Sequence, residues 1–170
     1  MKVAKTTFSG PVRSLAGFIN AGSTGVVSLT ADTTLTVASH AGRLLLTNDA
    51  DGKFTLPSID VTTPGDPTDP NQLNNLGATF TFLVITAATD MDILTDGTDK
   101  FVGGLYLGKS DAAGKTFMSG GSNDVITMNG TTKGGIVGSV VTCYAAASAK
   151  YVVSGTVLAS GTVVTPFADA

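Results

Sequence analysis

Alternation of apolar and polar residues is the main structural signal in this chain, and it is clearest in residues 25–37. There, apolar side chains recur at every second position on either side of an Ala31-Asp32 turn, at Val27, Leu29, Leu35 and Val37. Serine or threonine stands at positions 28, 30, 34 and 36 between them. A period of two places alternate side chains on opposite faces of a β-strand. The segment therefore predicts strand structure with one apolar face.

Further segments of this kind follow along the chain, separated by turn residues. The most apolar is residues 79–85, which we expect to form a central strand. The other expected strands are residues 12–19, 42–47, 53–59, 91–94, 100–107, 115–118, 125–128, 136–144 and 151–158. Asn48–Gly52 is the expected turn between the strands at 42–47 and 53–59, and Asn129-Gly130 is a hairpin signal, because a type I′ turn needs positive φ at both central residues. Turn signals about 8–12 residues apart predict an all-β fold, either an antiparallel β-sandwich or a jelly-roll-like barrel.

Two segments lack this alternation. Residues 1–13 are predicted to be an extended N-terminal arm, followed by a single β domain over residues 14–170. Residues 62–75 contain Pro64, Pro67 and Pro70 and are predicted to be a surface loop. Such a long loop is typical either of a contact surface or of a simple insertion, and both interpretations remain open.

Composition supports the same fold class. The chain has 170 residues, enough for one domain with a substantial core, and includes 26 Thr and 21 Gly. All 13 acidic residues are Asp, so Glu is absent. Glu is one of the straight-chain residues that fill exposed helix faces, whereas Thr and Val favour strands. The composition is that of an all-β protein.

Charge and cysteine usage exclude several classes of function. The net charge of −3 and the isoelectric point near 4.8 disfavour non-specific nucleic-acid binding. No run approaches the roughly 18 apolar residues that span a bilayer, and the basic start lacks the apolar run of a secretory signal. The sequence therefore predicts a soluble protein made in a cytoplasm, with no nucleic-acid or membrane partner. The single cysteine, Cys143, is expected to be a buried thiol within a strand.

One segment matches the phosphate-loop formula G-x-x-x-x-G-K-S/T. Residues 103–110 read Gly-Gly-Leu-Tyr-Leu-Gly-Lys-Ser. The loop binds phosphate only where a strand leads into a helix whose N-terminus faces the anion. Here Leu105-Tyr106-Leu107 favours a strand, and residues 111–115 favour a turn. We therefore predict no nucleotide site.

Other candidate chemistry is equally sparse. Four carboxylates, Asp90, Asp92, Asp96 and Asp99, lie within ten residues and are the kind of ligand that Ca²⁺ prefers, but turn residues around a short strand explain them as well. Whether they hold an ion is left open. His40 is the only histidine, and no nucleophile motif accompanies it. We therefore predict no catalytic residues, no cofactor and no enzymatic activity.

The closing third of the chain resembles a family of tailed-bacteriophage virion proteins. The resemblance rests on Asp124-x-Ile126, followed by Asn129-Gly130-Thr131-Thr132-Lys133-Gly134-Gly135 and the closing Gly161-Thr162-Val163-Val164-Thr165-Pro166-Phe167. A looser likeness runs through residues 42–82, up to Phe80-Thr81-Phe82, and residues 7–14 look like the start of marine phage structural proteins. The aromatic residue that usually precedes the last strand, often Trp, is Tyr151 here.

This resemblance implies a capsid decoration, or cement, protein that binds the outside of the assembled head and stabilises contacts between major capsid protein subunits. It also implies self-association as a trimer or dimer, since closed symmetric oligomers match the axes of a shell. The candidate capsid contacts are Lys2, Lys5, Phe8 and Arg13 of the arm, whose cations would meet an acidic surface.

Three alternatives remain. A tail-fibre or other host-surface-binding virion module would use the proline-rich loop and would occur in few copies per particle. A small phosphate-loop enzyme would lose ATP binding on Lys109→Ala. A calcium-dependent adhesin would melt at a lower temperature in chelator.

Overall fold

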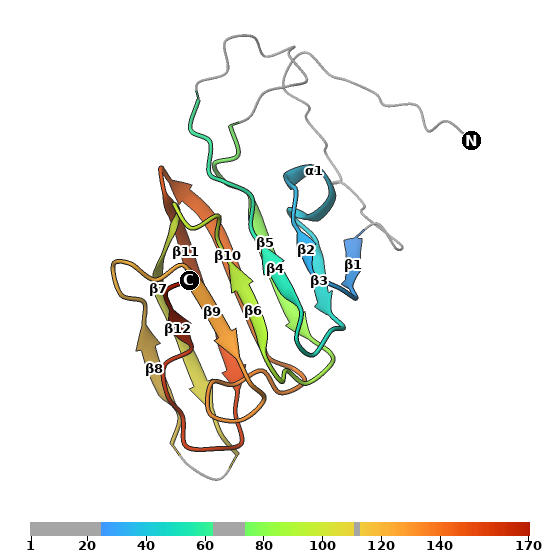
Figure 1. Cartoon of the computed structure of the whole chain (residues 1–170), viewed down its shortest axis with the longest axis vertical. Helices are drawn as coiled ribbons and strands as arrows, with labels where there is room; N and C mark the ends of the chain where they lie inside the picture. Colours follow the sequence, from blue (N-terminus) through green and yellow to red (C-terminus); the bar gives the residue numbers. More distant parts are fainter. Residues whose placement is uncertain (1–24, 63–73, 111–112) are drawn as a thin grey trace, which may run out of the picture.

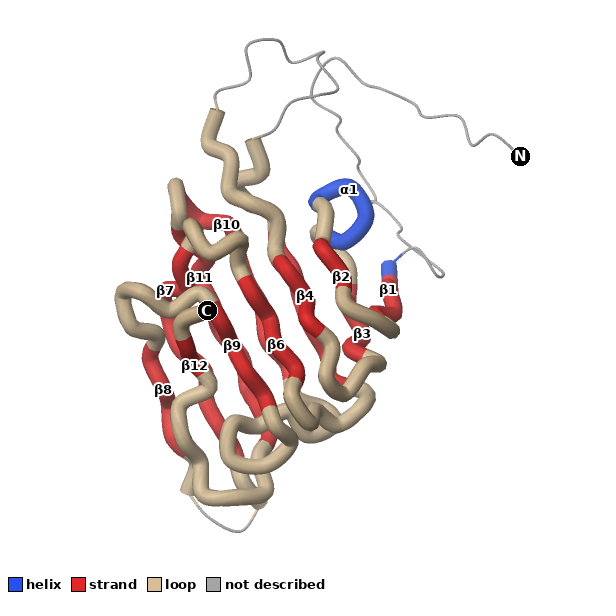
Figure 2. The backbone as a smooth tube through the Cα atoms, in the orientation of Figure 1, coloured by secondary structure: helices blue, strands red, loops and turns tan. Residues whose placement is uncertain are grey.

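Two β-sheets packed face to face form the protein. The computed structural model describes residues 25–62, 74–110 and 113–170 (Figure 1). One sheet has seven strands in the order β1 (Val26–Leu29), β3 (Leu44–Thr47), β5 (Thr79–Val84), β10 (Val140–Ala147), β11 (Lys150–Leu158), β7 (Lys100–Gly108) and β8 (Lys115–Met118). The other has five, in the order β12 (Phe167–Ala168), β9 (Val125–Met128), β6 (Met91–Leu94), β4 (Lys53–Thr55) and β2 (Thr33–Thr34). The five-stranded sheet lies in front of the seven-stranded one in Figure 2. The predicted all-β class is confirmed, and of the two predicted architectures the structure has the sandwich rather than the barrel.

The first six strands alternate between the two sheets. In the seven-stranded sheet β1, β3 and β5 are parallel neighbours, and in the five-stranded sheet β2, β4 and β6 are parallel neighbours. The chain therefore winds as a flattened coil of three turns, each of which adds one strand to each sheet. The sheets are consequently mixed, rather than purely antiparallel as the strand spacing had suggested.

The second half of the chain contributes to every antiparallel strand pair among the described residues. β10 pairs antiparallel with both β5 and β11, and β9 pairs antiparallel with both β6 and β12. A two-residue turn joins β10 to β11 and places Ala149 at a φ of 56°. β11 then pairs in parallel with β7, and β8 forms the outer edge beside β7.

The core lies between the two sheets and is rich in aromatic residues. Phe54 stacks on Phe82 with ring centroids 6.3 Å apart, and Phe80 meets Tyr151 edge to face at 6.5 Å. The Tyr151 hydroxyl donates to the backbone carbonyl of Pro57 at 2.6 Å, so its polar tip is satisfied inside the core. Cys143 is fully buried, as predicted, and burial raises the pKa of its thiol.

At two predicted turns, the prediction that the flanking strands pair with each other was wrong. Asn48–Gly52 does not join a pair of adjacent strands, because β3 and β4 belong to different sheets. Asn129-Gly130 does not form a hairpin either, because β9 and β10 also lie in different sheets and Asn129 lacks positive φ. Instead the Asn129 side chain organises a crossover loop, accepting from the backbone N–H groups of Thr131 and Lys133 at 3.1 and 2.9 Å.

A short helix replaces the end of one predicted strand. The alternation had extended a strand to Val37, but β2 ends at Thr34 and α1 (Val37–His40) follows. Thr36 caps this helix through its side-chain oxygen, which accepts from the Ser39 N–H at 3.3 Å. Nδ1 of His40 accepts from the Thr36 N–H at 2.9 Å, so the lone histidine closes a helical turn.

The predicted arm (residues 1–13), the predicted strand at residues 12–19 and most of the predicted loop at 62–75 lie outside the described residues. Lys2, Lys5, Phe8 and Arg13 fall within this part.

Candidate interaction surface

The seven-stranded sheet packs one side on the core, and its outward side, called here the outer face, has no sheet packed on it among the described residues. Its strands alternate core residues with outward ones. The strand register aligns the outward residues of neighbouring strands in rows across the sheet. The outward residues are Val26, Ser28, Leu44, Leu46, Thr79, Thr81, Leu83, Val102, Gly104, Tyr106, Thr116, Met118, Val140, Thr142, Tyr144, Val152, Ser154 and Thr156.

Exposed apolar groups are concentrated on the outer face. Of the eleven large hydrophobic side chains exposed among the described residues, five are outward residues of this sheet: Val26, Tyr106, Met118, Tyr144 and Val152. None of the eleven belongs to a strand of the five-stranded sheet. That sheet instead turns a charged pair outward, with Lys53 opposite Asp92 in the register. A solvated sheet face is normally polar, so the outer face has the character of a contact surface.

Charged residues are nearly excluded from the outer face. In its seven strands the charged side chains are three lysines, Lys100, Lys115 and Lys150, each at the first residue of its strand. There is no carboxylate in these strands. The surface is therefore an uncharged area with lysines at its ends, in a chain whose net charge is negative.

A cavity of about 460 Å³ opens at one end of the outer face. Its lining comes from β7, β11, the segments that follow these two strands, and the segment before β10. It consists of Tyr106, Gly108, Lys109, Ser110, Ile136, Thr156, Leu158 and Ala159. Tyr106 and Thr156 are register partners in neighbouring strands and belong both to the cavity and to the outer face. The two features are therefore continuous.

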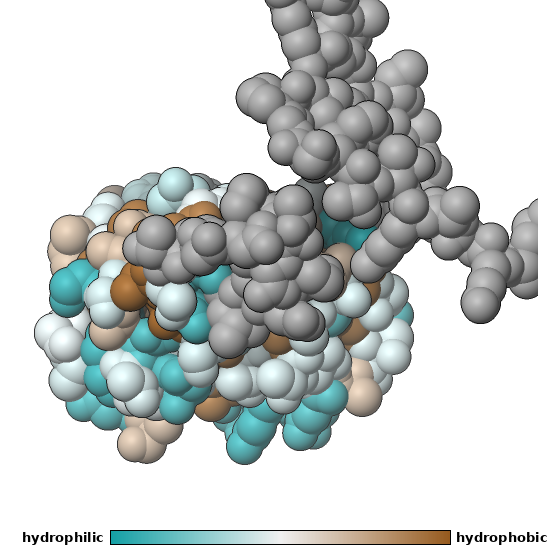
Figure 3. Space-filling view, turned by 90° about the horizontal axis from the view of Figure 1, so that it is seen from above, coloured by the Kyte–Doolittle hydropathy of each residue, from teal (hydrophilic) through white to brown (hydrophobic). Residues whose placement is uncertain are grey.

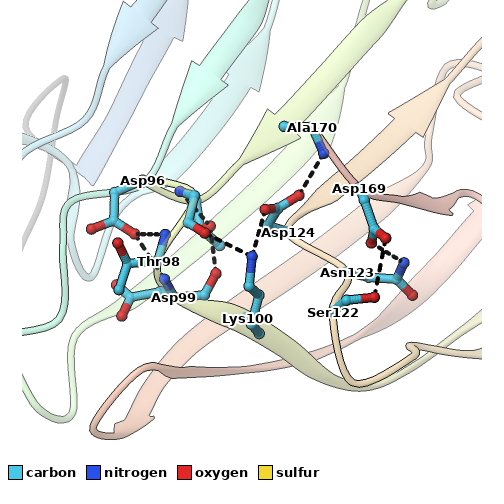
Figure 4. A network of polar contacts seen from close by, with 11 residues as sticks. Asp96, Thr98, Asp99, Lys100, Ser122, Asn123, Asp124, Asp169 and Ala170 are labelled. Atoms are coloured by element: carbon cyan, nitrogen blue, oxygen red, sulfur yellow. Dashed lines mark hydrogen bonds and ion pairs between the residues drawn. The ribbon is translucent and has the colours of Figure 1, made fainter.

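A polar network at the opposite end of β7 ties the two sheets and the C-terminal residues together. Lys100 Nζ contacts a carboxylate oxygen of Asp124 and the Gly97 carbonyl, each at 2.7 Å (Figure 4). The other Asp124 oxygen accepts from the Ala170 N–H at 2.8 Å, and the neighbouring Asp169 accepts from Asn123 at 2.7 Å. Burial alone raises the pKa of Asp124. Its hydrogen bonds from Lys100 and the Ala170 amide, together with the Lys100 charge, outweigh burial and lower that pKa below its ordinary value.

We expect the Asp124 network to make the fold sensitive to acid. A carboxyl whose pKa is lowered by folding adds stability above its ordinary pKa of about 3.9, and this stability is lost as the pH falls through its folded pKa. Asp124→Asn should reduce the free energy of unfolding at pH 7 by about 1–2 kcal/mol, and by progressively less below pH ~4. Urea unfolding at several pH values measures this difference.

Asp169→Asn is the control, because Asp169 is an exposed carboxylate of the same network. This substitution should change the free energy of unfolding by less than about 0.5 kcal/mol. An Asp124→Asn loss that does not depend on pH would contradict the assigned role.

The four clustered carboxylates do not converge on a common point. Asp92 faces Lys53, while Asp96 accepts from the N–H groups of Thr98 and Asp99 at 2.9 and 2.8 Å and shapes a turn. Despite its partial burial, these and other hydrogen bonds lower the pKa of Asp96. Asp99 accepts from the Ile59 N–H at 2.7 Å, and its burial raises its pKa. Among residues 25–62, 74–110 and 113–170, no group of three or more His, Cys, Asp or Glu side chains is placed to hold a metal ion.

The phosphate-loop match is a strand. Residues 103–108 lie in β7, where they pair with β11 on one side and β8 on the other. Their backbone groups are thus committed to a sheet, and the described residues that follow lead to another strand rather than to a helix. Gly103 has a φ of 118°, and an added Cβ would collide with the carbonyl oxygen of Val153. This glycine is required by strand packing.

No helix within the described ranges is long and apolar enough to cross a bilayer. Figure 3 views the end that carries α1, where hydrophilic and apolar residues are mixed over the part of the surface that this view shows. Comparison of the chain with protein-family models, curated proteins and solved structures found no match.

Proposed function

We propose that this protein is a bacteriophage capsid decoration protein that docks on the outside of the assembled head through its outer face and acts without catalysis. The observation that supports this proposal most directly is the uncharged outer face, with five exposed large apolar side chains on a rigid sheet. The resemblance of residues 123–167 to phage virion proteins supplies the partner, the major capsid protein.

The outer face by itself is smaller than a standard protein–protein interface, so docking on the capsid needs a second contact. Seven strands spaced ~4.8 Å apart give a width of roughly 30 Å, and five residues along a strand span roughly 17 Å. The projected area is about 500 Å², against the roughly 800 Å² that each partner contributes to a standard interface. In our proposal the remaining contact comes from the arm, where Lys2, Lys5, Phe8 and Arg13 meet an acidic capsid surface.

Decoration would stabilise the head by mass action. A protein that binds only the assembled lattice lowers the free energy of that state, in proportion to its affinity and concentration. Repetition over many sites makes a modest individual affinity effective for the whole shell. A folded sheet suits this work because it loses little conformational entropy on docking. Self-association as a trimer or dimer would match the symmetry axes of the shell.

The direct test is binding of the purified protein to undecorated capsids. We expect Val152→Glu to weaken binding by about tenfold or more, because it would bury an unpaired charge at the centre of the interface. Thr34→Glu is the matched control, since Thr34 is exposed on the five-stranded sheet and should leave binding unchanged. Equal binding by both variants and the wild type would contradict docking through the outer face.

Copy number in purified virions tests the wider proposal. Quantitative mass spectrometry should find this chain at a ratio to the major capsid protein near one, or at a simple fraction such as one third. A handful of copies per particle would favour the tail-fibre or host-surface-binding alternative. Complete absence from virions would contradict both virion roles.

A further inference from the structure

The edge of the seven-stranded sheet at β8 is open to a further strand. β8 is the last strand of its sheet, and no described residue pairs with its outer side (Figure 1). The edge strands of the five-stranded sheet, β2 and β12, have two residues each, and such short edges resist pairing. β1, at the opposite edge, follows closely on residues 1–24, which lie outside the described residues. Within the described part of the chain, β8 is therefore the best-defined open edge.

Two residues of β8 point their backbone groups away from the sheet. Ser119, directly after the strand, donates its N–H to the Gly103 carbonyl of β7 at 3.0 Å. In an antiparallel ladder every second residue bonds to the same neighbour. Thr116 and Met118, which lie between the residues bonded to β7, consequently turn their N–H and C=O groups to the open side. These groups form the template to which another strand adds.

The side chains at this edge are apolar on both sides of the sheet. Met118 is 69% exposed, the highest value among the large hydrophobic residues described. Its side chain lies over Gly104, where an added Cβ would come 2.9 Å from the sulfur. On the inward side, Phe117 packs against the core and stays partly exposed. A strand added beside β8 would cover both side chains.

β8 can pair with β8 of a second copy in one favourable register. Directly opposed residues of an antiparallel pair share a face of the sheet, so the two-fold axis must pass through a residue. Centred on Phe117, the pairing places Thr116 opposite Met118 of the second copy, and the open backbone groups meet. The two Lys115 are then four residues apart along the strand, ~14 Å, beyond the Debye length of ~8 Å at physiological salt. Centring on Thr116 would instead make these lysines diagonal neighbours at ~7–8 Å.

The charges at the ends of the pair are also complementary. Lys115 lies on the inward side of its sheet, because its register partner Leu107 faces the core. In the pairing it stands opposite Ser119 of the second copy, where the chain leads on to Ser122. The Ser122 hydroxyl donates at 3.1 Å to the exposed carboxylate of Asp169, which follows β12 on that same inward side. Each copy thus brings a cation to the end at which the other carries a carboxylate.

We propose that two copies of this chain pair through β8, antiparallel and centred on Phe117, to form one continuous sheet. A two-fold axis perpendicular to the sheet keeps both outer faces on the same side. The joined surface measures roughly 1,000 Å², compared with the roughly 800 Å² that one partner contributes to a standard interface. The pairing is a property of the free protein, and only its consequence at the capsid rests on the proposed function.

Disulfide trapping tests the register. Thr116 and Met118 of different copies would be opposed at about 5.5 Å between Cα atoms, a distance that a disulfide spans. Full-length Thr116→Cys and Met118→Cys, mixed in equal amounts under mild oxidation, should form a linked dimer on non-reducing gels. Each variant alone should form far less, because identical residues are diagonal neighbours at ~7–8 Å. The native Cys143 is buried and stays unlinked. No excess of mixed dimer would overturn the proposal.

Sedimentation equilibrium of the full chain measures the pairing itself. The wild type is expected to exchange between monomer and dimer, since a four-residue strand buries less than a standard interface. Thr116→Lys should weaken the dimer by about tenfold or more, because it sets two lysines diagonally across the joint. Ser154→Lys adds the same charge to the same face, but in β11, and should leave the dimer unchanged. Equal weakening by both variants, or a wild type that is monomeric at ~1 mM, would overturn the proposal.

Binding to undecorated capsids separates this inference from the proposed function. A dimer that forms in solution but fails to bind capsids would contradict the decoration function and leave the pairing standing. A wild type that binds capsids but gives no mixed disulfide would overturn the pairing and leave decoration standing. Thr116 and Ser154 are both exposed, so the two lysine variants should melt like the wild type, and thermal melts check that the fold is kept.

Discussion

Replacing Tyr151 by alanine is expected to lower the free energy of unfolding by about 4 kcal/mol, in the range measured for large aromatic residues cut back to alanine in cores. Tyr151 has no exposed surface and packs edge to face against Phe80. Alanine would remove the ring contacts and leave a cavity in the middle of the core. It would also leave the Pro57 carbonyl without the hydroxyl that donates to it at 2.6 Å.

Urea unfolding of Tyr151→Ala and Tyr151→Phe separates these two contributions. Phenylalanine keeps the ring and removes the hydroxyl, so it should lower stability by only about 1 kcal/mol. The packing position thus accepts a phenylalanine ring, and tyrosine gains stability there from a polar partner inside the core. If the two variants lost equal stability, the hydrogen bond would dominate and our assignment of ring packing as the main term would be wrong.

Gly103→Ala is expected to lower stability by about 3–5 kcal/mol, because two separate penalties coincide. A φ of 118° is unfavourable for any residue with a Cβ. In addition, that Cβ would overlap the Val153 carbonyl oxygen across the β7–β11 pair. The strands would have to separate at a point where both carry core side chains.

Gly97→Ala is the matched control for Gly103→Ala. Gly97 has a φ of 85°, yet an added Cβ would meet nothing within 4 Å. It should therefore show the backbone penalty alone, about 1–2 kcal/mol. Urea unfolding measures both variants. If Gly103→Ala and Gly97→Ala lowered the free energy of unfolding equally, the clash with the Val153 carbonyl would contribute nothing, and close packing of β7 on β11 would not be the reason for glycine at position 103. Neither variant should bind ATP, since residues 103–108 form a strand.

Much of the outer face could have been predicted from the sequence. The strand predictions for residues 79–85, 100–107, 115–118 and 151–158, all of which belong to the seven-stranded sheet, match the structure within a residue. Once a strand is assigned, its outward residues follow from the alternation, and the position of the lysines at strand starts is visible in the sequence. The contacts predicted from the sequence, Lys2, Lys5, Phe8 and Arg13, all belong to the arm, and none is an outward residue of these strands.

The cavity and the polar network at Asp124 could not have been predicted in this way. The cavity needs Tyr106 beside Thr156, which are 50 residues apart and meet only because β7 and β11 pair in parallel. The Asp124 network needs Lys100 and the Ala170 amide to meet at one carboxylate. No local pattern encodes either meeting, because each depends on which strands become neighbours.

The sequence by itself determined the class of fold, most of the strands and the side of each of these strands that faces the core. These properties follow from the period-two alternation, which sets side-chain direction within a strand. Only the tertiary structure decided the pairing partners, so that β3 and β4 separate into different sheets while β3 and β5 become parallel neighbours. The physical reason is that two sheets share one core. A strand buries the same apolar face whether it returns beside its predecessor or crosses to the opposite sheet, and the alternation is identical in both cases.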